Sequence, residues 1–588
     1  MRFHLLGVGS IGSLFATHLS TLDSTQVRLI LRRKDLASQL LNPASSHEPS
    51  LHPHGTIRLE RDGLVRKTTN LEMELTRDPA EASLSRSRSS STRPTPRIDP
   101  SVWLRNDPIE TLIVTTKAPQ TLPALRHILP RLSSRSTIVL CQNGMGTLEG
   151  LLEKYWPEDR SDEIERERAA SPRLGPGSDD QWHLGVGGRP SFICATTTHG
   201  AWRKGGGHFV HAGMGDVKFG VLPNRAVLSA LSNHPQPSWS SPSENPLLNP
   251  RSLVDPTLEH LPLTSATFNL HTTVSSLLSL NELQPTWLPL PTLEIAQLQK
   301  LAVNASVNSL TALMGVNNGA LIGSQKAKDL ITTVSNECGS VFAAHIAQEE
   351  GTWTPPSLSH PSSSFPSYDD NDNSSDFLAE AEPSHPLPPP LPNHHPLSPR
   401  SLLAHTLSVL FKTSSNLSST LSDLIPLQAT TSFTLDNAPS LPSRTEIDFI
   451  NGYVTALGKR YGIETPVVKA LGQMVLLKEE MGRVGAVDRI WNHRTGVKIG
   501  STKTTREGKD LNEGRGSKLT RRPSIFSSPS TSSRPGSEES DSGRSVAEVR
   551  KSHARAEKWD RITKESQDRA RSREIERIQR DRGHDQGG

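Results

Sequence analysis

A lysine and three neighbouring polar side chains could carry out acid–base chemistry, because they recur on one face of an otherwise apolar segment. On an ideal helix these positions fall within roughly 80° of one another; they are Lys300, Asn304, Asn308 and Thr311. Buried amides without partners are costly, so we expect this face to line a cleft. Partial desolvation there would lower the pKa of Lys300, which suits a proton donor near neutral pH. The alternative is a lysine that snorkels from the start of a helix beside structural amides.

A carboxylate stands at the start of a second candidate helix. Glu446 lies in the first turn of a segment that begins at Thr445. The apolar stripe of this segment comprises Ile447, Ile450, Val454 and Leu457. A carboxylate in the first turn is favoured by the helix dipole. Residue types alone therefore leave Glu446 as either a helix cap or a member of a site.

A glycine-rich turn near the N-terminus predicts a phosphate site. The apolar run at residues 3–6 is followed by GxGxxG and then by helical spacing over residues 13–19. This strand–turn–helix context is typical of dinucleotide binding, with the phosphates at the helix N-terminus. The expected cofactor-binding residues are Gly7, Val8, Gly9, Ser10, Ile11 and Gly12. A glycine-rich turn without a ligand is the alternative.

The end of the next predicted strand indicates which dinucleotide would bind. An NAD site usually carries Asp or Glu there, for the ribose hydroxyl. Here the strand over residues 27–31 ends in Arg32-Arg33-Lys34, as a 2′-phosphate would require, and this favours NADPH. Asp35 follows at once, so NAD and a solvated basic turn both remain open.

Two further apolar strands end in polar residues. Lys117 and Gln120 follow the strand over residues 111–116, and Asn143 follows the strand over residues 136–141. Ligands bind beyond the carboxyl ends of parallel strands, so these side chains should lie near the cofactor. Taken by position alone, Asn143 could instead be an ordinary turn residue.

Taken in chain order, these stretches resemble the ketopantoate reductase (2-dehydropantoate 2-reductase) family, in a fungal-like form with long inserts. The matching segments read GVGSIGS, TTKAPQ, QNGMG, KLAVNASVNSLTALMGVNNGAL and RTEIDFINGYV. The resemblance implies NADPH-dependent reduction of 2-dehydropantoate to (R)-pantoate, in pantothenate and coenzyme A biosynthesis. It also implies a Rossmann domain followed by a helical domain, with the active site between them.

The resemblance assigns a role to each matching residue. It makes Lys300 the general acid and Glu446 the active-site glutamate. The expected substrate-binding residues are Asn143, Asn304, Asn308, Asn318 and Ser432. Arg32 would bind the 2′-phosphate, while Lys117, Gln120 and Asn143 would line the cofactor. The sequence departs from the family pattern at Gln299, where an aromatic residue is common, and in the spacing between Ser432 and Glu446.

Two other functions stay open. One is a related NADPH-dependent reductase of another 2-oxo acid, because proteins of one fold can act on different substrates. The other is a non-catalytic regulatory or RNA-associated protein on the same scaffold. Loss of the lysine or the glutamate would mark the second case, and both Lys300 and Glu446 are present.

Composition limits the remaining classes. Of 588 residues, 33% are hydrophobic and 4% aromatic, which predicts a folded core interrupted by polar inserts. The net charge of +4 gives no overall case for nucleic-acid binding. Three scattered cysteines predict neither a disulfide framework nor a metal site. No apolar run is long enough to predict a membrane span.

The expected fold is α/β, with a Rossmann-type NADP-binding domain and a C-terminal all-α domain like that of 6-phosphogluconate dehydrogenase. The first domain should span residues 1–230, with disordered inserts at about 84–100 and 158–188. A linker over residues 231–263 should lead to the helical domain over residues 264–495, which has a disordered insert at about 352–400. Residues 496–588 read as a disordered or charged-helical tail.

The expected location is the cytoplasm, and the mitochondrion stays open although no presequence is visible before the first strand. We expect a small 2-oxo acid as substrate and no membrane partner, and a homodimer stays open. The charged tail has no identified partner.

Overall fold

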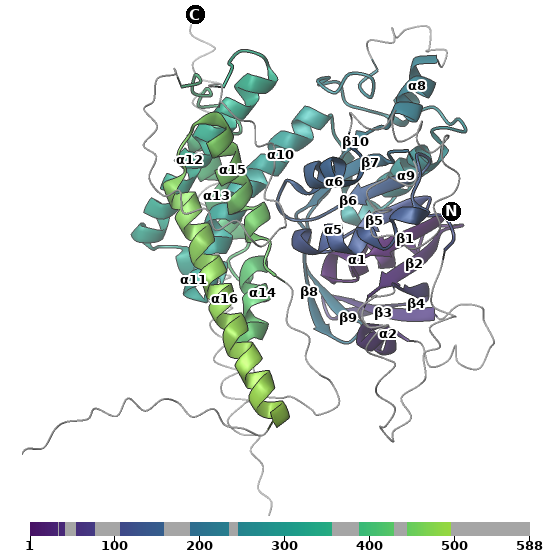
Figure 1. Cartoon of the computed structure of the whole chain (residues 1–588), viewed down its shortest axis with the longest axis horizontal. Coiled ribbons are helices and arrows are strands. Elements are labelled where there is room, and N and C mark those ends of the chain that lie inside the picture. The colour runs from purple at the N-terminus through teal and green to yellow at the C-terminus, as the bar shows by residue number, and fades with distance from the viewer. Residues whose placement is uncertain are drawn as a thin grey trace, which may run out of the picture. The chain divides into compact units, whose positions relative to one another are not determined.

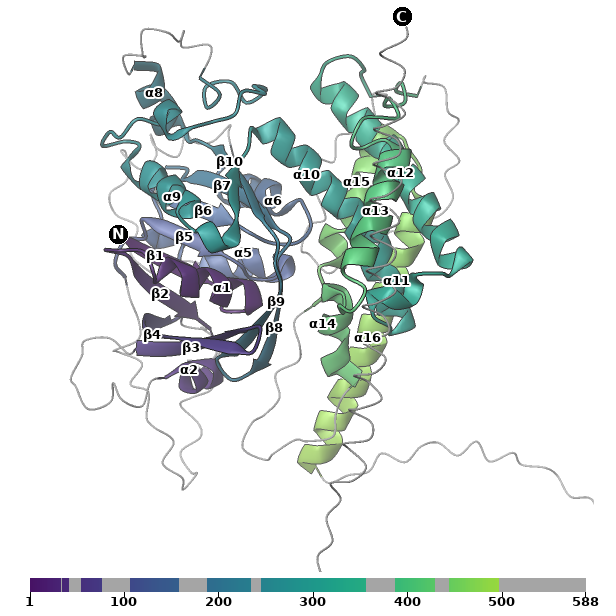
Figure 2. The ribbon, with the colours of Figure 1, turned by 180° about the vertical axis from the view of Figure 1, so that it is seen from behind.

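The computed structural model describes residues 1–32, 34–41, 54–76, 106–157, 188–233, 245–355, 387–428 and 444–495. The expected insert at 84–100 lies outside these residues, as do all but the last residue of the expected insert at 158–188, most of that at 352–400, and the tail from residue 496. Ser432 also lies outside them. Figures 1 and 2 show the described elements from opposite sides.

Six parallel strands form the centre of the N-terminal sheet, in the order β4-β2-β1-β5-β6-β7. They are β1 (Arg2–Leu6), β2 (Gln26–Leu31), β4 (Leu64–Leu75), β5 (Thr111–Val114), β6 (Thr137–Leu140) and β7 (Ser191–Thr197). Counted along the chain, this is the 3-2-1-4-5-6 order of a Rossmann sheet. The predicted fold class is therefore confirmed, and the order reverses between β1 and β5, where such sheets bind dinucleotides.

Shorter strands extend both edges of this sheet. On one side β10 (Val217–Leu222) pairs antiparallel with β7, and β11 (Pro285–Trp287) pairs parallel with β10. On the other side β3 (His54–Arg61) pairs antiparallel with β4 and is followed by β9 (His208–Gly213) and β8 (Gly200–Gly205).

Helices cover both faces of the sheet, which explains why the central strands read as continuous apolar runs. On one face lie α1 (Ser10–Leu19), α2 (Lys34–Leu40), α8 (Arg225–Asn233) and α9 (Phe268–Leu278). On the other lie α5 (Ala118–Arg126), η2 (Leu129–Arg131) and α6 (Thr147–Tyr155). Adjacent residues of a strand point to opposite faces, so Leu5 packs in the first core and Leu6 in the second.

The C-terminal part is helical and has a core of its own, centred on residues such as Val341, Phe342 and Val454. Its main helices are α10 (Leu290–Val303), α11 (Ser309–Met314), α12 (Gln325–Glu349), α13 (Pro399–Lys412), α14 (Ser419–Gln428), α15 (Asn451–Tyr461) and α16 (Pro466–Thr495). A π-helical segment, η8 (Asn304–Asn308), joins α10 to α11. The long α16 packs on α14 and α15 (Figure 2).

Short 3-10 segments complete the described elements. They are η6 (Leu258–His260), η7 (Asn281–Leu283), η9 (Asn318–Leu321) and η10 (Ile447–Phe449). The helix predicted to begin at Thr445 is therefore divided into η10 and α15. Its predicted apolar stripe is buried as expected, from Ile447 to Leu457.

The sheet part extends further along the chain than the sequence predicts. Leu247 and Leu261, in the expected linker, are buried in the core of the sheet. So are Leu270 of α9 and Trp287 of β11, which were expected in the helical domain. The helical part therefore begins at α10. The periodicity of α9 is the same whether it packs on a sheet or on helices, so the sequence did not separate the two cases.

The expected insert at 352–400 also ends earlier than predicted. Leu397 is fully buried in the helical core, and the Ser398 side chain accepts a hydrogen bond from the backbone N–H of Ser401 at the start of α13. The proline-rich run suggested disorder, but one buried leucine and one N-cap are enough to order its end.

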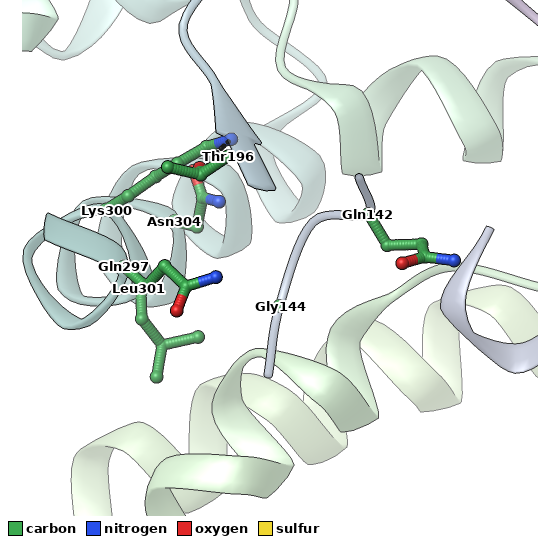
Figure 3. Close-up of a pocket in the computed structure, with 7 residues that line it drawn as sticks. All are labelled: Gln142, Gly144, Thr196, Gln297, Lys300, Leu301 and Asn304. Carbon is green, nitrogen blue, oxygen red and sulfur yellow. Dashed lines mark hydrogen bonds between the residues drawn. The ribbon is translucent and has the colours of Figure 1, made fainter. Parts of the chain in front are cut away.

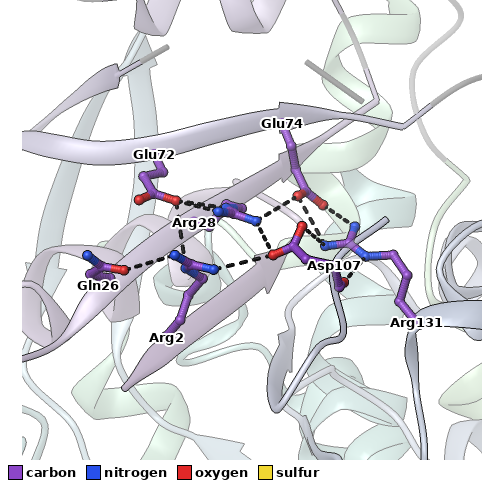
Figure 4. A network of polar contacts seen from close by, with 7 residues as sticks. All are labelled: Arg2, Gln26, Arg28, Glu72, Glu74, Asp107 and Arg131. Atoms are coloured by element: carbon purple, nitrogen blue, oxygen red, sulfur yellow. Dashed lines mark hydrogen bonds and ion pairs between the residues drawn. The ribbon is translucent and has the colours of Figure 1, made fainter. Parts of the chain in front are cut away.

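An ionic network lies on the sheet where β1, β2 and β4 meet (Figure 4). The side chain of Arg28 in β2 is 4% exposed, and its guanidinium lies 2.7 Å from both Glu72 Oε2 and Asp107 Oδ2. Arg131 binds Glu74 at 2.6 Å, and Arg2 lies 3.3 Å from Asp107 Oδ2. Three cations and three carboxylates thus balance one another in a largely buried position.

Two kinds of feature are absent from the described residues. None of the helices in the described ranges is long and apolar enough to cross a membrane. Within the same ranges, no group of three or more His, Cys, Asp or Glu side chains could hold a metal ion.

Candidate active site

The glycine-rich turn between β1 and α1 has the geometry that a bound dinucleotide needs. Gly7 has φ +103°, and a Cβ there would clash with the backbone of Thr116 after β5. At Gly9, by contrast, no atom lies within 4 Å of a Cβ position, and Gly9 is the N-cap of α1 without a side-chain cap. The N-terminus of α1 is therefore open to a phosphate at the point where the strand order reverses.

Arg32 follows directly after β2, and its side chain is exposed. Val8 is buried, while Ser10 and Ile11 are half-buried in the first turn of α1. The side chains of Lys34 and Asp35 lie outside the description, as does Arg33. The described residues of the turn thus fit a dinucleotide, and the exposed Arg32 lies at the end of the next strand.

Lys300, near the end of α10, reaches the carboxyl end of β7. Its Nζ donates to the carbonyl oxygen of Thr197 at 2.8 Å and to Thr196 Oγ1 at 3.2 Å. Burial lowers the pKa of Lys300, although Cys141 and Glu446 act in the opposite direction. A lysine with a lowered pKa gives up its proton more readily than an exposed one.

A small pocket lies beside Lys300 (Figure 3). It encloses about 240 Å³ of space, part of it open to solvent. Its lining comes from α10 and η8, from β7 and from the loop after β6, and comprises Gln142, Gly144, Thr196, Gln297, Lys300, Leu301 and Asn304. Most of these groups can hydrogen-bond, and Leu301 supplies an apolar surface.

Glu446 joins the helical part to the sheet part. Its carboxylate is buried and accepts hydrogen bonds from Lys117 Nζ at 3.1 Å and from the backbone N–H of Ala118 at 3.2 Å. Asn143 Nδ2 donates to the same carboxylate at 3.4 Å. Glu446 therefore faces the N-terminus of α5 and holds two of the residues expected near the cofactor.

Asp423 of α14 is a second carboxylate on Lys117, with Oδ2 3.0 Å from Nζ. Burial would lower the pKa of Lys117, but the charges of Glu446 and Asp423 raise it overall. Burial raises the pKa of Asp423 to about 6, and nearby Glu446 adds to the rise against the effect of Lys117. Lys117 is thus a fixed cation between two carboxylates, and its neighbour Gln120 is half-buried in the first turn of α5.

The predicted polar stripe divides in two. Lys300 and Asn304 line the pocket, whereas Asn308 Nδ2 donates to Ser419 Oγ at 3.4 Å and Thr311 Oγ1 to Ser418 Oγ at 2.8 Å. Asn308 lies one turn further along the axis than Asn304, within the π-helical η8, and there the neighbouring element is α14. Asn318 lies in η9, where its Nδ2 donates to Thr413 Oγ1 at 2.9 Å.

Several residues of the site were not predicted from the sequence. Thr196 anchors Lys300, Asp423 pairs with Lys117, and Ser419 contacts Asn308. Ser419 and Asp423 are four residues apart and so share a face at the start of α14, a spacing that is visible in the sequence. Gln297 lies one helical turn before Lys300 on the pocket side of α10.

Two family models match the chain and together span more than half of it. The model described as "Ketopantoate reductase PanE/ApbA" matches residues 58–224. The model described as "Ketopantoate reductase PanE/ApbA C terminal" matches residues 293–431 and 440–479. One covers much of the sheet part, and the other covers the helical part from α10 to α16.

Individual relatives are distant. A Schizosaccharomyces pombe protein named "Probable 2-dehydropantoate 2-reductase" is 26% identical over 481 residues, which cover 82% of this chain and 96% of the relative. A Beauveria bassiana protein named "Ketoisovalerate reductase" is 23% identical over 338 residues, covering 57% of this chain and 56% of the relative. The solved structure of D-mandelate dehydrogenase with NADH and anilino(oxo)acetate aligns at 18% identity and a TM-score of 0.47, covering 82% of this chain and 100% of that chain.

Proposed function

Because the chain belongs to the ketopantoate reductase family of oxidoreductases, we propose that it reduces 2-dehydropantoate to (R)-pantoate with NADPH. The observation that carries the proposal is the position of Lys300. Its ammonium has a lowered pKa and lies at the carboxyl edge of the nucleotide-binding sheet, in a pocket lined by carboxamides. The product would serve pantothenate and coenzyme A biosynthesis.

We assign the cofactor to the turn at Gly7–Gly12. The uncapped N-terminus of α1 would bind the pyrophosphate, and Arg32 the 2′-phosphate. Reduced nicotinamide, when bound, supplies the hydride. Gly9 leaves room for a phosphate at the backbone, because no atom occupies the place of its Cβ.

Lys300 would act as the general acid of the reaction. As the carbonyl carbon is reduced, an N–H bond of Lys300 breaks and an O–H bond forms on the former carbonyl oxygen. The carbonyl oxygen of Thr197 and the hydroxyl of Thr196 hold the ammonium in position for this transfer. The neutral amine then regains a proton from solvent.

Other residues would position the reactants. Asn304 faces the same pocket as Lys300 and would orient the 2-oxo acid. Asn308 and Asn318, the other expected substrate-binding amides, contact Ser419 and Thr413 instead of lining this pocket. Glu446 accepts bonds from Lys117, Ala118 and Asn143, so we assign to it the task of fixing the residues near the cofactor. Ser419, which contacts Asn308, is the described serine that best fits the substrate-binding role expected of Ser432.

A second candidate substrate is 3-methyl-2-oxobutanoate (ketoisovalerate). The name of the Beauveria bassiana relative favours it. It differs from 2-dehydropantoate in lacking the hydroxymethyl group on the branched tail. The same cofactor and the same proton donor would serve both reactions.

The test is turnover by the purified protein, followed through loss of the absorbance of NADPH. We expect reduction of 2-dehydropantoate, which Lys300→Met should slow by about 100-fold or more, because general acids contribute on that scale. Lys326→Met is the matched control, since that side chain is 94% exposed on α12. Arg32→Gln should weaken the binding of NADPH more than the binding of NADH. Failure of the wild-type protein to oxidise NADPH with either 2-oxo acid would contradict the proposal.

A further inference from the structure

Two carboxamide side chains of the pocket have no hydrogen-bond partner within the described part of the chain. The side chain of Gln142 donates to Thr121 Oγ1 at 3.0 Å, and Thr196 accepts from Lys300 at 3.2 Å. The side chains of Gln297 and Asn304, by contrast, line the pocket without a hydrogen bond to another described residue. Figure 3 shows both amides on the Lys300 side of the pocket. Polar groups that are half-buried and unused in this way are suited to bind a ligand.

These two groups lie on either side of Lys300 along one helix face. Gln297 is about one turn before Lys300 and Asn304 about one turn after it, so their Cα atoms are roughly 10 Å apart along the axis. A 2-oxo acid whose carbonyl oxygen meets Lys300 would direct its carboxylate to one side and its tail to the other. The two amides can therefore contact opposite ends of one substrate.

The end at Gln297 suits the tail. Leu301 follows Gln297 by one turn on the same face, and both side chains line the pocket (Figure 3). An apolar group beside a carboxamide matches a branched hydrocarbon that carries a hydroxyl. At the other end, the side chain of Asn304 offers an amide N–H, a donor that suits the carboxylate.

We infer that Gln297 is a specificity-determining residue that binds a hydroxyl group on the tail of the substrate. The site then selects branched 2-oxo acids with a terminal hydroxyl over analogues that lack it. This inference rests on the proposed function. Its physical basis is that an analogue without the hydroxyl leaves the amide of Gln297 desolvated and unpaired. The addition or loss of a methyl group on the substrate would change kcat/KM less.

The experiment compares kcat/KM for 2-dehydropantoate with kcat/KM for 3-methyl-2-oxobutanoate, both with NADPH. We expect the wild-type enzyme to prefer the hydroxylated substrate, and Gln297→Leu to lower the ratio by about tenfold or more, the worth of one hydrogen bond. Gln299→Leu is the control on the same helix, because Gln299 Nε2 donates to the carbonyl oxygen of Pro396 instead of facing the pocket. It should leave the ratio unchanged.

The possible outcomes separate the two proposals. An unchanged ratio in Gln297→Leu, or a wild-type preference for 3-methyl-2-oxobutanoate, would overturn the role of Gln297 while the reductase assignment stands. Turnover of neither acid by the wild-type protein would overturn both. Gln297→Met keeps the length of the side chain and should repeat the result, which guards against a folding defect specific to leucine.

Discussion

The pH dependence of kcat/KM should reflect the pKa of Lys300, which the surroundings of this lysine determine. Burial lowers the pKa of Lys300 from the ordinary 10.5, and in the proposed mechanism the protonated form donates the proton. The rate kcat/KM should therefore fall as pH rises through this lowered pKa, earlier than for an exposed lysine. The pH profile of kcat/KM for 2-dehydropantoate measures the position of this alkaline limb.

Lys300→Arg provides the control for that profile. Arginine keeps the positive charge but stays protonated throughout the accessible range, so it cannot act as the acid. We expect this variant to lose most of its activity and to show no alkaline limb of its own. A limb at the position of an ordinary lysine in the wild-type enzyme would contradict the assignment.

A buried histidine in β1 should make the fold sensitive to acid. Neither ring nitrogen of His4 has a partner among the described residues, and burial, with Arg131 and Arg28 nearby, lowers its pKa to about 3. Between pH 6.5 and about 3 the unfolded chain therefore binds a proton that the folded chain does not. Stability should fall as pH drops through this range.

His4→Leu should remove this dependence. We expect the variant to be at least as stable as the wild type at neutral pH and to lose less stability on acidification. Urea unfolding at neutral and mildly acidic pH measures both quantities. His394→Gln, at an exposed position, should follow the wild type. Parallel losses of stability in His4→Leu and in the wild type would contradict the prediction.

At the residue scale, the sequence predicted chemistry where one residue type stood out from its surroundings. Lys300 stands out because a lysine is unusual on a helix fit for burial, and Gly7 and Gly9 because their spacing is specific. Thr196, Ser419 and Asp423 carry no such signal. Their relevance depends on contacts with Lys300, Asn308 and Lys117, which are remote in sequence, and a lone polar residue near the start of a helix is usually a cap.

Among the elements, β2 shows how pairing creates an environment that its own sequence does not reveal. Because β2 and β4 are parallel and in register, Arg28 lies beside Glu72 (Figure 4). Arg28→Met should destabilise the protein by about 3–5 kcal/mol, since it leaves buried carboxylates without their cation. Equilibrium unfolding at neutral pH measures the loss.

An exposed ion pair gives the contrast for Arg28. Arg66 pairs with Glu282 at 3.0 Å, but its side chain is 47% exposed. Arg66→Met should therefore change the stability by no more than about 1 kcal/mol. Equal effects of the two substitutions would show that the network around Arg28 is not desolvated as the structure indicates.

The positions of elements with a strong periodicity were predicted well, but the contacts that these elements make in the fold were not. β1, α1, β2, β5 and β6 lie where the apolar runs placed them. The π turn at η8 was not predicted, because nothing in the residue types of 304–308 separates it from a regular helix. The contacts of the two amides were not predicted either: Asn304 faces the pocket, whereas Asn308, one turn further on, contacts Ser419 of α14.

On the scale of the whole molecule, the site exists only because the sheet and helical parts meet. Lys300 Nζ donates to the carbonyl oxygen of Thr197, Glu446 accepts from Lys117 Nζ, and the backbone N–H of Met145 donates to the carbonyl oxygen of Phe449 at 2.8 Å. These contacts join three separate stretches of the sheet part to two stretches of the helical part. Their convergence follows from the fold, since the carboxyl ends of parallel strands lie at one edge.

Gly144, in the loop after β6, is where this approach is closest. Its φ is +84°, and a Cβ would clash with the carbonyl oxygen of Phe449 in η10. Gly144→Ala should therefore leave each part folded but shift the helical part, with Lys300, relative to the sheet. A displacement of this kind can lower kcat/KM by about 100-fold. The affinity for NADPH should fall less than kcat/KM, because the turn at Gly7–Gly12 belongs to the sheet part alone, whereas of the residues expected near the cofactor only Lys117 and Asn143 contact Glu446 of the helical part.

Gly63→Ala separates this effect from simple backbone strain. Gly63, in the turn between β3 and β4, has a similar φ of +78°, but no atom lies within 4 Å of its Cβ position. Both variants carry the cost of a left-handed alanine, about 1 kcal/mol, yet Gly144→Ala alone meets the other part of the molecule. Steady-state kinetics and NADPH binding on the two variants decide the matter. If Gly144→Ala and Gly63→Ala have the same kcat/KM, the close approach at Gly144 is not needed for catalysis. If the two variants also lose the same amount of stability, the effect of Gly144→Ala comes from its φ alone.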